Sequence, residues 1–245
     1  MATLTTEAPP APVEQRPSGV WLWITTVDHK RIGILYGVTA IAFFIIGGIE
    51  ALLIRLQLTG PNGEVLSSDA YNQMFTMHGT TMVFLVIMPL AAAFTNYFLP
   101  LLIGARDVAF PRLNAFSYWV FLSGGVFLYI SFFVGGGPDA GWFAYAPLST
   151  EVPEIVRMDY WAVGLLVLGV ASIASAANFI TTVFTMRAPG MTLMRMPVFV
   201  WMALVVQFLL LFALPIITVG LFQVFFDRNF GTNFFQAAGG GDPVL

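Results

Sequence analysis

Cysteine is absent from the 245 residues, and charged residues make up only 9% of them. The lack of cysteine excludes disulfide bonds, thiolate metal sites and thiol catalysis within the chain. A soluble domain carries about 25% charged residues, enough to cover its surface with polar groups. This chain cannot do so, and lipid must therefore replace water around much of it. The net charge of −3 gives no indication of nucleic-acid binding.

Long apolar segments stand in place of the missing charge: 58% of the residues are hydrophobic, and the mean hydropathy is +0.84. Each segment reaches the roughly 20 residues that a helix needs to cross a bilayer core. Strands are excluded as membrane spans, because no alternating pattern is present and open sheet edges are not tolerated in lipid. The sequence therefore predicts an all-α integral membrane protein with five transmembrane helices, at about residues 32–56, 72–103, 113–134, 160–186 and 196–226.

Lysine and arginine predict the orientation of these helices. Residues 1–20, rich in Pro, Thr and Ala, are expected to be a disordered cytoplasmic tail, and residues 21–245 the transmembrane domain. With the N-terminus in the cytoplasm, seven basic residues lie inside and three outside, as the positive-inside rule requires. The seven are Arg16, Lys30, Arg31, Arg106, Arg112, Arg187 and Arg195, and the three are Arg55, Arg157 and Arg228.

His78 is the only histidine within an apolar segment. A histidine that has lost its water needs a strong partner, either a neighbouring helix or a metal, and both interpretations stand. Arg55 ends the first segment at about the same depth. It either extends its charge to the membrane surface, which the sequence favours, or donates a hydrogen bond to a buried acceptor. His29, in a polar cluster before the first segment, is expected to be a solvated loop residue.

Uncharged polar side chains collect in the half of the segments expected to lie toward the cytoplasm. Such groups either join helices, at about 0.6 kcal/mol per contact, or hold a file of water. Asp107, in the loop at the mouth of this set, favours water and protons. The alternative is an exposed ion pair between Asp107 and its neighbouring arginines. The set comprises Tyr36, Asn96, Asn114, Ser117, Ser172, Ser175 and Asn178.

Nine blocks of sequence resemble subunit I of the haem–copper terminal oxidases, and they run in order from about residue 27 to the end. They are VDHKRIGILY, ALLIRLQL, YNQMFTMHGTTMVFLVIMP, NYFLPLLIGARDVAFPRLN, GWFAYAPLS, ANFITTVF, MRAPGMTLMRMPVFVW, DRNFGTNFF and GGGDP. The resemblance implies a twelve-helix bundle in a prokaryotic plasma membrane, surrounded by membrane lipid, with partners of the subunit II and III type. It also implies a proton-pumping enzyme. Electrons would pass from cytochrome c through a low-spin haem, of the haem A type, to a high-spin haem and copper.

The resemblance also implies roles for single residues. His78 matches the axial ligand of the low-spin haem from the second helix. Arg55 matches the arginine that hydrogen-bonds the formyl group of that haem, and Tyr71 a tyrosine near its propionates. Trp142 matches a tryptophan near the propionates of the oxygen-binding haem. Asp107 matches the entrance acid of a proton pathway, whose polar lining is matched by Asn96, Asn114, Ser117, Ser172 and Asn178, with Tyr36 beside it.

The sequence departs from its quinol-oxidising relatives at the residues that hold quinol. Where these relatives have an arginine, an acid and a histidine, this chain has Ile46, Glu50 and Ala70. Gln73 matches a quinol-site glutamine that also occurs in cytochrome c oxidases. Cytochrome c is therefore the expected electron donor, and quinol the alternative. Gln57 replaces a carboxylate that helps some relatives bind a cation at the outer face, so that cation is not expected here.

The GGGDP block has a further implication. In the family it precedes a sixth helix that brings the first copper-binding histidine and a proton-gating glutamate. The copper ligands are therefore expected beyond residue 245, so that the chain is truncated before the copper site and inactive by itself. A non-haem membrane transporter or structural protein is the alternative from another functional class.

Overall fold

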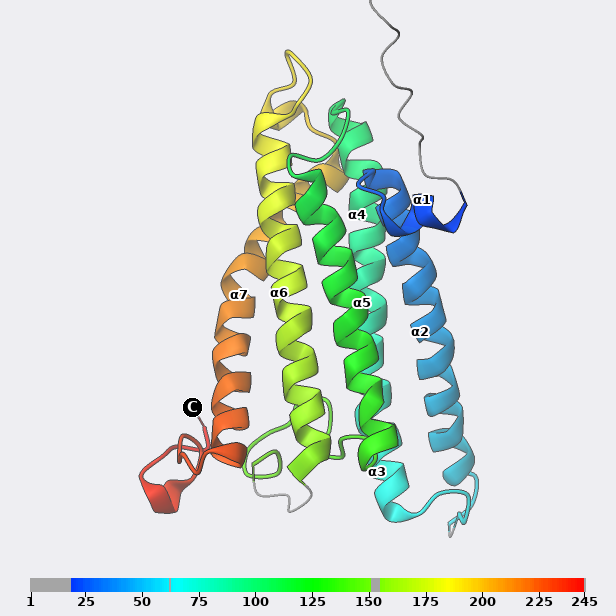
Figure 1. Ribbon diagram of the computed structural model, residues 1–245, viewed down its shortest axis with the longest axis vertical. Helices are drawn as coiled ribbons and strands as arrows, with labels where there is room; N and C mark the ends of the chain where they lie inside the picture. The colour runs from blue at the N-terminus through cyan, green and yellow to red at the C-terminus, as the bar shows by residue number, and fades with distance from the viewer. Residues whose placement is uncertain (1–18, 62, 151–154, 245) are drawn as a thin grey trace, which may run out of the picture.

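The computed structural model describes residues 19–61, 63–150 and 155–244. Within these residues five long helical rods stand side by side in one bundle, and no strand is present (Figure 1). All five are long and apolar enough to cross a membrane, which confirms the predicted all-α membrane architecture. The rods are α2 (His29–Gln57), a composite of α3 (Ser68–Thr80), η1 (Thr81–Ile87) and α4 (Met88–Ile103), then α5 (Pro111–Val134), α6 (Ile155–Thr185) and α7 (Val198–Asn229).

Most of the packing joins rods that are neighbours in the chain, but α2 also packs against α5 and α4 against α7. Helix α2 packs along α3, η1 and α4, α5 packs against α6, and α6 packs against α7. The loops before α2, between α4 and α5, and between α6 and α7 share one end of the bundle. The loops that lead into α3 and α6 share the opposite end with the C-terminal residues (Figure 1). These are called the Asp107 end and the Ser67 end below.

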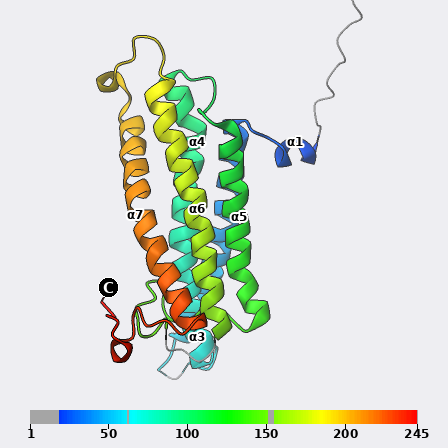
Figure 2. The same cartoon turned by 60° about the vertical axis from the view of Figure 1, so that its left-hand side comes forward.

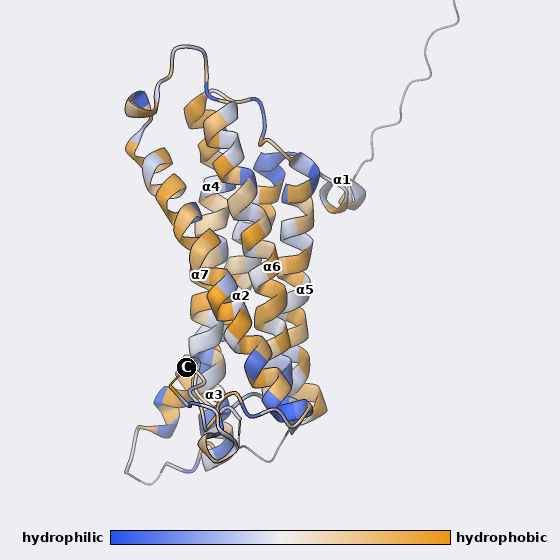
Figure 3. Ribbon diagram, turned by 90° about the vertical axis from the view of Figure 1, so that its left-hand side faces the viewer, coloured by the Kyte–Doolittle hydropathy of each residue, from blue (hydrophilic) through white to orange (hydrophobic). Residues whose placement is uncertain are grey.

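Helix α2 shows why these segments need lipid. Exposed apolar side chains recur along it every three or four residues, among them Ile34, Val38, Ile41 and Leu52. The opposite stripe is buried and contains small or polar residues, including Glu50. Figure 3 shows the same arrangement along the bundle, with hydrophobic colour over the middle of the helices and hydrophilic colour near their ends. An apolar surface around a partly polar interior is the pattern of a helix that faces hydrocarbon.

Side-chain caps begin two of the helices earlier than the hydrophobic pattern predicts. The Asp28 carboxylate accepts the N–H groups of Lys30 and Arg31, at 2.9 and 3.0 Å, and so α2 begins at His29 rather than residue 32. The Ser67 hydroxyl accepts the N–H of Ala70, so α3 begins at Ser68 rather than residue 72. Apolar periodicity detects the part of a helix inside the membrane, whereas caps extend it into the interface.

Most of the expected N-terminal tail, residues 1–18, lies outside the described residues. Its last two residues, Gly19 and Val20, are described, and Val20 begins the short helix α1 (Val20–Ile24). Figure 2 shows α1 projecting sideways from the bundle at the Asp107 end. Trp21 and Trp23 of α1 are exposed, as expected for side chains in the interfacial layer of a membrane.

The composite rod changes its winding in the middle. Residues Thr81–Ile87 form a π-helix immediately before Pro89. Proline has no N–H to donate to the carbonyl of Leu85, so an α-helical bond is missing there and the backbone widens locally. The wider turn changes the helical phase between His78 and Asn96. Both residues nevertheless face α2: His78 bonds the Gly47 carbonyl oxygen, and Asn96 lies against Gly33.

Gly33 sets the closest approach between α2 and α4. A Cβ atom at this position would lie 3.0 Å from the carbonyl oxygen of Ala93 and 3.1 Å from the backbone nitrogen of Tyr97. Both obstacles are backbone atoms, which cannot rotate away as a flexible side chain can. The backbones of α2 and α4 can therefore approach this closely only if residue 33 has no side chain.

We expect Gly33→Ala to destabilise the protein by about 1–3 kcal/mol, because the added methyl group overpacks the contact between α2 and α4. Thermal unfolding of the purified protein in detergent measures the change. Gly48→Ala is the matched control on the same helix, since a Cβ there meets no atom within 4 Å. Its expected effect is neutral, or a stabilisation of up to about 1 kcal/mol from helix propensity. Equal losses in the two variants would contradict this packing role.

Candidate functional site

His78 lies in the last turn of α3, half-buried, and is held by the neighbouring helix. Its Nδ1 lies 2.9 Å from the carbonyl oxygen of Gly47 on α2. A carbonyl can only accept, so Nδ1 carries the proton and Nε2 is the unprotonated nitrogen. Histidines that bind metals usually have this arrangement, with one nitrogen bonded to a carbonyl and the other presented to the metal. The bond to a neighbouring helix and the role of metal ligand are therefore compatible, and His78 fits an axial ligand.

His78 does not belong to a cluster of metal-binding side chains among the described residues. Within residues 19–61, 63–150 and 155–244, no three His, Cys, Asp or Glu side chains converge as a metal site.

Trp142 is held against the helix that carries His78. A Cβ atom on Gly79 would lie only 2.8 Å from the indole Cδ1 of Trp142, so the ring packs directly on the α3 backbone. The N–H of Gly141 donates to the Thr76 hydroxyl at 2.9 Å, which fixes the loop before Trp142 to the same helix. The fold thus brings Trp142 against Gly79, the residue that follows His78, from a position more than sixty residues further along the chain.

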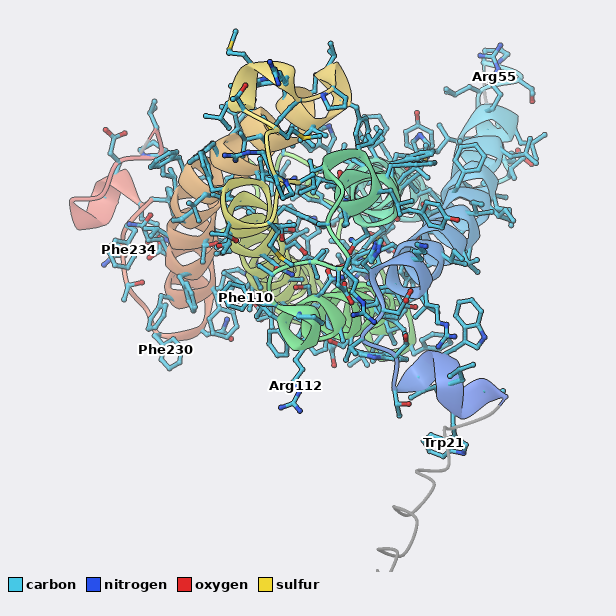
Figure 4. The ribbon with its side chains drawn as sticks, turned by 90° about the horizontal axis from the view of Figure 1, so that it is seen from above. Trp21, Arg55, Phe110, Arg112, Phe230 and Phe234 are labelled. Atoms are coloured by element: carbon cyan, nitrogen blue, oxygen red, sulfur yellow. The ribbon has the colours of Figure 1, made fainter. Side chains whose placement is uncertain are left out.

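Arg55 and Tyr71 lie near the Ser67 end. Arg55 is exposed in the last turn of α2, and Figure 4 shows its side chain at the edge of the bundle, pointing away from the other helices. The described residues thus place Arg55 on the surface, as expected if it extends its charge to the interface. Tyr71 is half-buried in the first turn of α3. Of the predicted cofactor-binding residues, Trp142 packs on the helix that carries His78, whereas Arg55 lies apart on the surface.

At the Asp107 end, α6 fixes the loop between α4 and α5. The Asn178 carboxamide accepts the N–H of Phe110 at 2.9 Å and donates to the carbonyl of the same residue at 3.1 Å. One turn later, the Thr182 hydroxyl accepts the N–H of Ala109 at 2.9 Å. Asn178 therefore anchors the loop that carries Asp107. Thr182 is not among the residues predicted from the sequence, although its spacing of four residues from Asn178 places the two on one face of a helix.

Asp107 is half-buried in this loop, and its carboxylate accepts the N–H of Val108 at 2.7 Å. Burial raises the pKa of the Asp107 carboxyl, while hydrogen bonds from the backbones of Val108 and His29 oppose the rise. Asp107 therefore holds its proton to a higher pH than a surface aspartate does. Figure 4 shows Arg112 pointing away from the bundle, so the geometry does not favour an ion pair between Arg112 and Asp107.

His29 is not the solvated loop residue that the sequence predicts. It is only 2% exposed, and its Nδ1–H donates to the backbone carbonyl of Asn96 at 2.8 Å. The prediction was wrong because the Asp28 cap makes His29 the first helical residue and turns its ring toward α4. His29 therefore lies between Asp107 and Asn96. The signal in the sequence was the capping aspartate immediately before the histidine.

Buried polar groups continue from this end into the bundle. Asn96, Asn114 and Ser117 are fully buried. Among the described residues, Asn96 Oδ1 and both polar side-chain atoms of Asn114 have no hydrogen-bond partner. Polar atoms buried without a partner cost free energy and are commonly satisfied by internal water. Tyr36 and Ser172 lie further along, in the lining of a mostly apolar cavity of about 530 Å³ among the helices.

The chain resembles known proteins over most of its length. Residues 31–245 match the family described as cytochrome c and quinol oxidase polypeptide I. A cytochrome c oxidase subunit 1 from Bacillus sp. (strain PS3) is 51% identical over 226 residues, which cover 92% of this chain and 37% of the relative. A probable cytochrome c oxidase subunit 1-alpha from Streptomyces avermitilis is 49% identical, covering 94% of this chain and 40% of the relative.

Relatives that are named as quinol oxidases also match this chain. A quinol oxidase subunit 1 from Bacillus subtilis (strain 168) is 44% identical over 229 residues, covering 92% of this chain and 35% of the relative. The chain thus spans 35–40% of the length of these relatives. Because the family match covers nearly the whole chain, this protein belongs to the cytochrome c and quinol oxidase polypeptide I family.

Proposed function

We propose that this chain forms the N-terminal part of subunit I of a proton-pumping cytochrome c oxidase, in which His78 is an axial ligand of a low-spin haem. The observation that carries the proposal is the bond from His78 Nδ1 to the Gly47 carbonyl, which leaves Nε2 for iron. A haem held by His78 would supply one-electron transfer. Its second ligand, and the ligands of the high-spin haem and copper, come from outside residues 1–245.

The other residues near the Ser67 end would orient that haem. Arg55 would donate a charge-assisted hydrogen bond to the formyl group of a haem A, and Tyr71 would lie near the propionates. Trp142, packed on Gly79, would lie toward the propionates of the oxygen-binding haem. Family membership favours this function over a transporter or a structural protein.

Proton entry would occur at the Asp107 end. Asp107 takes up a proton from water, and its raised pKa keeps it protonated over a wider pH range. Water bound to the buried carboxamides of Asn96 and Asn114, and to Ser117, would carry the proton inward without a buried charge. Asn178 positions the entrance loop, and the path continues past Tyr36 and Ser172. In the plasma membrane of a prokaryote, the Asp107 end and the N-terminus face the cytoplasm, as the distribution of basic residues indicates.

The hydrogen bonds of Gln73 favour cytochrome c over quinol as the electron donor. Its Oε1 accepts the N–H of Gly137 at 2.8 Å and its Nε2 donates to Asp69 at 2.7 Å, so both ends of its carboxamide are engaged. Gln73 is 9% exposed, and Ile46 and Ala70 offer no polar group to a quinol. Cytochrome c would deliver its electrons through a subunit of the subunit II type.

In the assembled oxidase, we expect turnover with reduced cytochrome c and none above background with ubiquinol. Gln73→Leu tests the reason directly. Since Gln73 is engaged within the protein, this variant should lower stability without changing the preference for the donor. Ubiquinol oxidation by the wild-type enzyme, abolished in Gln73→Leu, would instead identify a quinol oxidase.

His78→Ala should abolish the low-spin haem spectrum of the assembled oxidase, because no other side chain there can offer an imidazole nitrogen to iron. Absorption and electron paramagnetic resonance spectra measure the loss. His29→Ala is the matched control, since it removes a histidine with the same type of backbone bond from the other end of α2. An unchanged low-spin spectrum in His78→Ala would remove His78 from the site.

Asp107→Asn should slow turnover and proton pumping by about an order of magnitude or more, since the variant removes the group that accepts the proton at the entrance. Both haem spectra should be unaltered, because the change is made at the opposite end of the bundle. Proton uptake is measured on each side of vesicles that contain oriented enzyme. The deficit is expected on the cytoplasmic side only, so a deficit on the outer side would reverse the proposed orientation. Wild-type pumping would exclude Asp107 from the path.

A further inference from the structure

Glu50 is a buried acid that the functions above do not use. It lies in the apolar helix α2 and is only 5% exposed. Its carboxylate points to the inside of the bundle, where it meets α5, rather than toward lipid. An acid within a membrane segment is costly, and such residues commonly take part in proton movement.

Three side chains form a hydrogen-bonded chain that ends on this acid. The Tyr129 hydroxyl of α5 donates to Glu50 Oε1 at 3.0 Å. The Thr81 hydroxyl lies 2.6 Å from the same Tyr129 oxygen. Because Tyr129 has only one proton and donates it to Glu50, Thr81 must donate to Tyr129. The second carboxylate oxygen, Oε2, has no hydrogen-bond partner among the described residues, so it is the oxygen that can take a proton.

Glu50 and Thr81, the two ends of this hydrogen-bonded set, lie close to the hydrogen bond between His78 and Gly47. Glu50 follows Gly47, whose carbonyl accepts from His78, by three residues on α2. Thr81 follows His78 by three residues along the next rod. Three residues span about 4.5 Å along a helix, so the buried Glu50 and the half-buried His78 lie at about the same depth in the bundle. Charges interact strongly at this depth because the apolar surroundings screen them less than water does.

We propose that Glu50 is a redox-linked proton site, which binds a proton on Oε2 when the centre ligated by His78 gains an electron. The proposal rests on the proposed function of His78. One electron from reduced cytochrome c is matched by one proton from water, and both are released when the electron moves on. Added negative charge favours the neutral carboxylic acid, and by linkage the bound proton favours the added electron.

Few other titratable or charged groups near Glu50 could take up the proton in its place. Among the described residues, α5 presents Tyr129 to Glu50 and α3 contributes His78, while η1 contains no titratable residue. Arg55, on α2 itself, lies at the exposed end of the helix. The neutral hydroxyls of Tyr129 and Thr81 keep Glu50 Oε1 as an acceptor and leave the proton change to Oε2.

Two variants distinguish a proton-binding role of Glu50 from a purely structural role as the hydrogen-bond acceptor of Tyr129. Glu50→Gln retains an oxygen that can accept from Tyr129 but cannot exchange a proton, whereas Glu50→Leu removes both properties. In the assembled wild-type oxidase the midpoint potential of the low-spin haem should fall as pH rises, because deprotonated Glu50 disfavours the electron. Both variants should lose this contribution to the slope. Glu64→Gln, at an exposed acid in the loop after α2, is the matched control and should keep the full slope.

Infrared spectroscopy supplies a readout that does not depend on the variants retaining activity. The reduced-minus-oxidised spectrum of the wild type should contain a carboxylic-acid C=O band that is absent in Glu50→Gln. In Tyr129→Phe this band should move to higher frequency, since Oε1 loses its donor. The lack of any such band in the wild type would overturn the proposal even if the Glu50 variants do not assemble.

Other outcomes also overturn it. A wild-type pH slope in Glu50→Gln would make Glu50 a hydrogen-bond acceptor only. Ubiquinol oxidation by the wild type that is lost in Glu50→Gln, with an unchanged slope, would make Glu50 a quinol ligand. An unchanged low-spin spectrum in His78→Ala would refute the proposed function itself, whereas loss of that spectrum with an unchanged slope in Glu50→Gln refutes this inference alone.

Discussion

In hydrocarbon, every buried polar group must find its partner within the protein, and most features of this structure follow from that constraint. The five rods expose apolar stripes to lipid and turn their polar side chains toward one another. The glycine at position 33 allows two backbones to meet, so that polar groups on α2 and α4 come within reach of each other. Where a partner is absent among the described residues, as at Asn96, Asn114 and Glu50, the unsatisfied atom marks a place where water or a proton can act.

The two histidines show one solution used at both ends of α2. Each donates its Nδ1–H to a backbone carbonyl of a neighbouring helix. His29 of α2 donates to Asn96 of α4, and His78 of α3 donates to Gly47 of α2. The bond holds the antiparallel pair together and selects the tautomer in which Nε2 is unprotonated. At the Asp107 end this nitrogen belongs to a buried residue beside an acid. Near the Ser67 end it belongs to a half-buried ring, which the proposed function places on iron.

The two ends of the bundle also differ in how they are closed. At the Ser67 end, ion pairs join the helices, with Arg157 on Asp69 and Arg228 on Asp159. At the Asp107 end, the described contacts that fix the α4–α5 loop come from neutral groups, the carboxamide of Asn178 and the hydroxyl of Thr182. An entrance fixed by neutral groups leaves the charge of Asp107 available for protons, whereas a network of ion pairs would hold it as a permanent carboxylate.

The number of spans and their limits within a few residues could be read from the sequence alone, and the sequence also selected His78 and Asp107 as candidates. These depend on hydropathy and on the rarity of charge in lipid, which are local properties of the chain. Only the tertiary structure decided that His29 is buried, that Asn178 anchors a loop and that Glu50 faces Tyr129 rather than lipid. It also decided that Arg55 stands at the edge of the bundle. Each of these facts depends on which faces of distant helices meet, and no periodicity within one helix contains that information, because small residues and caps set the contact between helices.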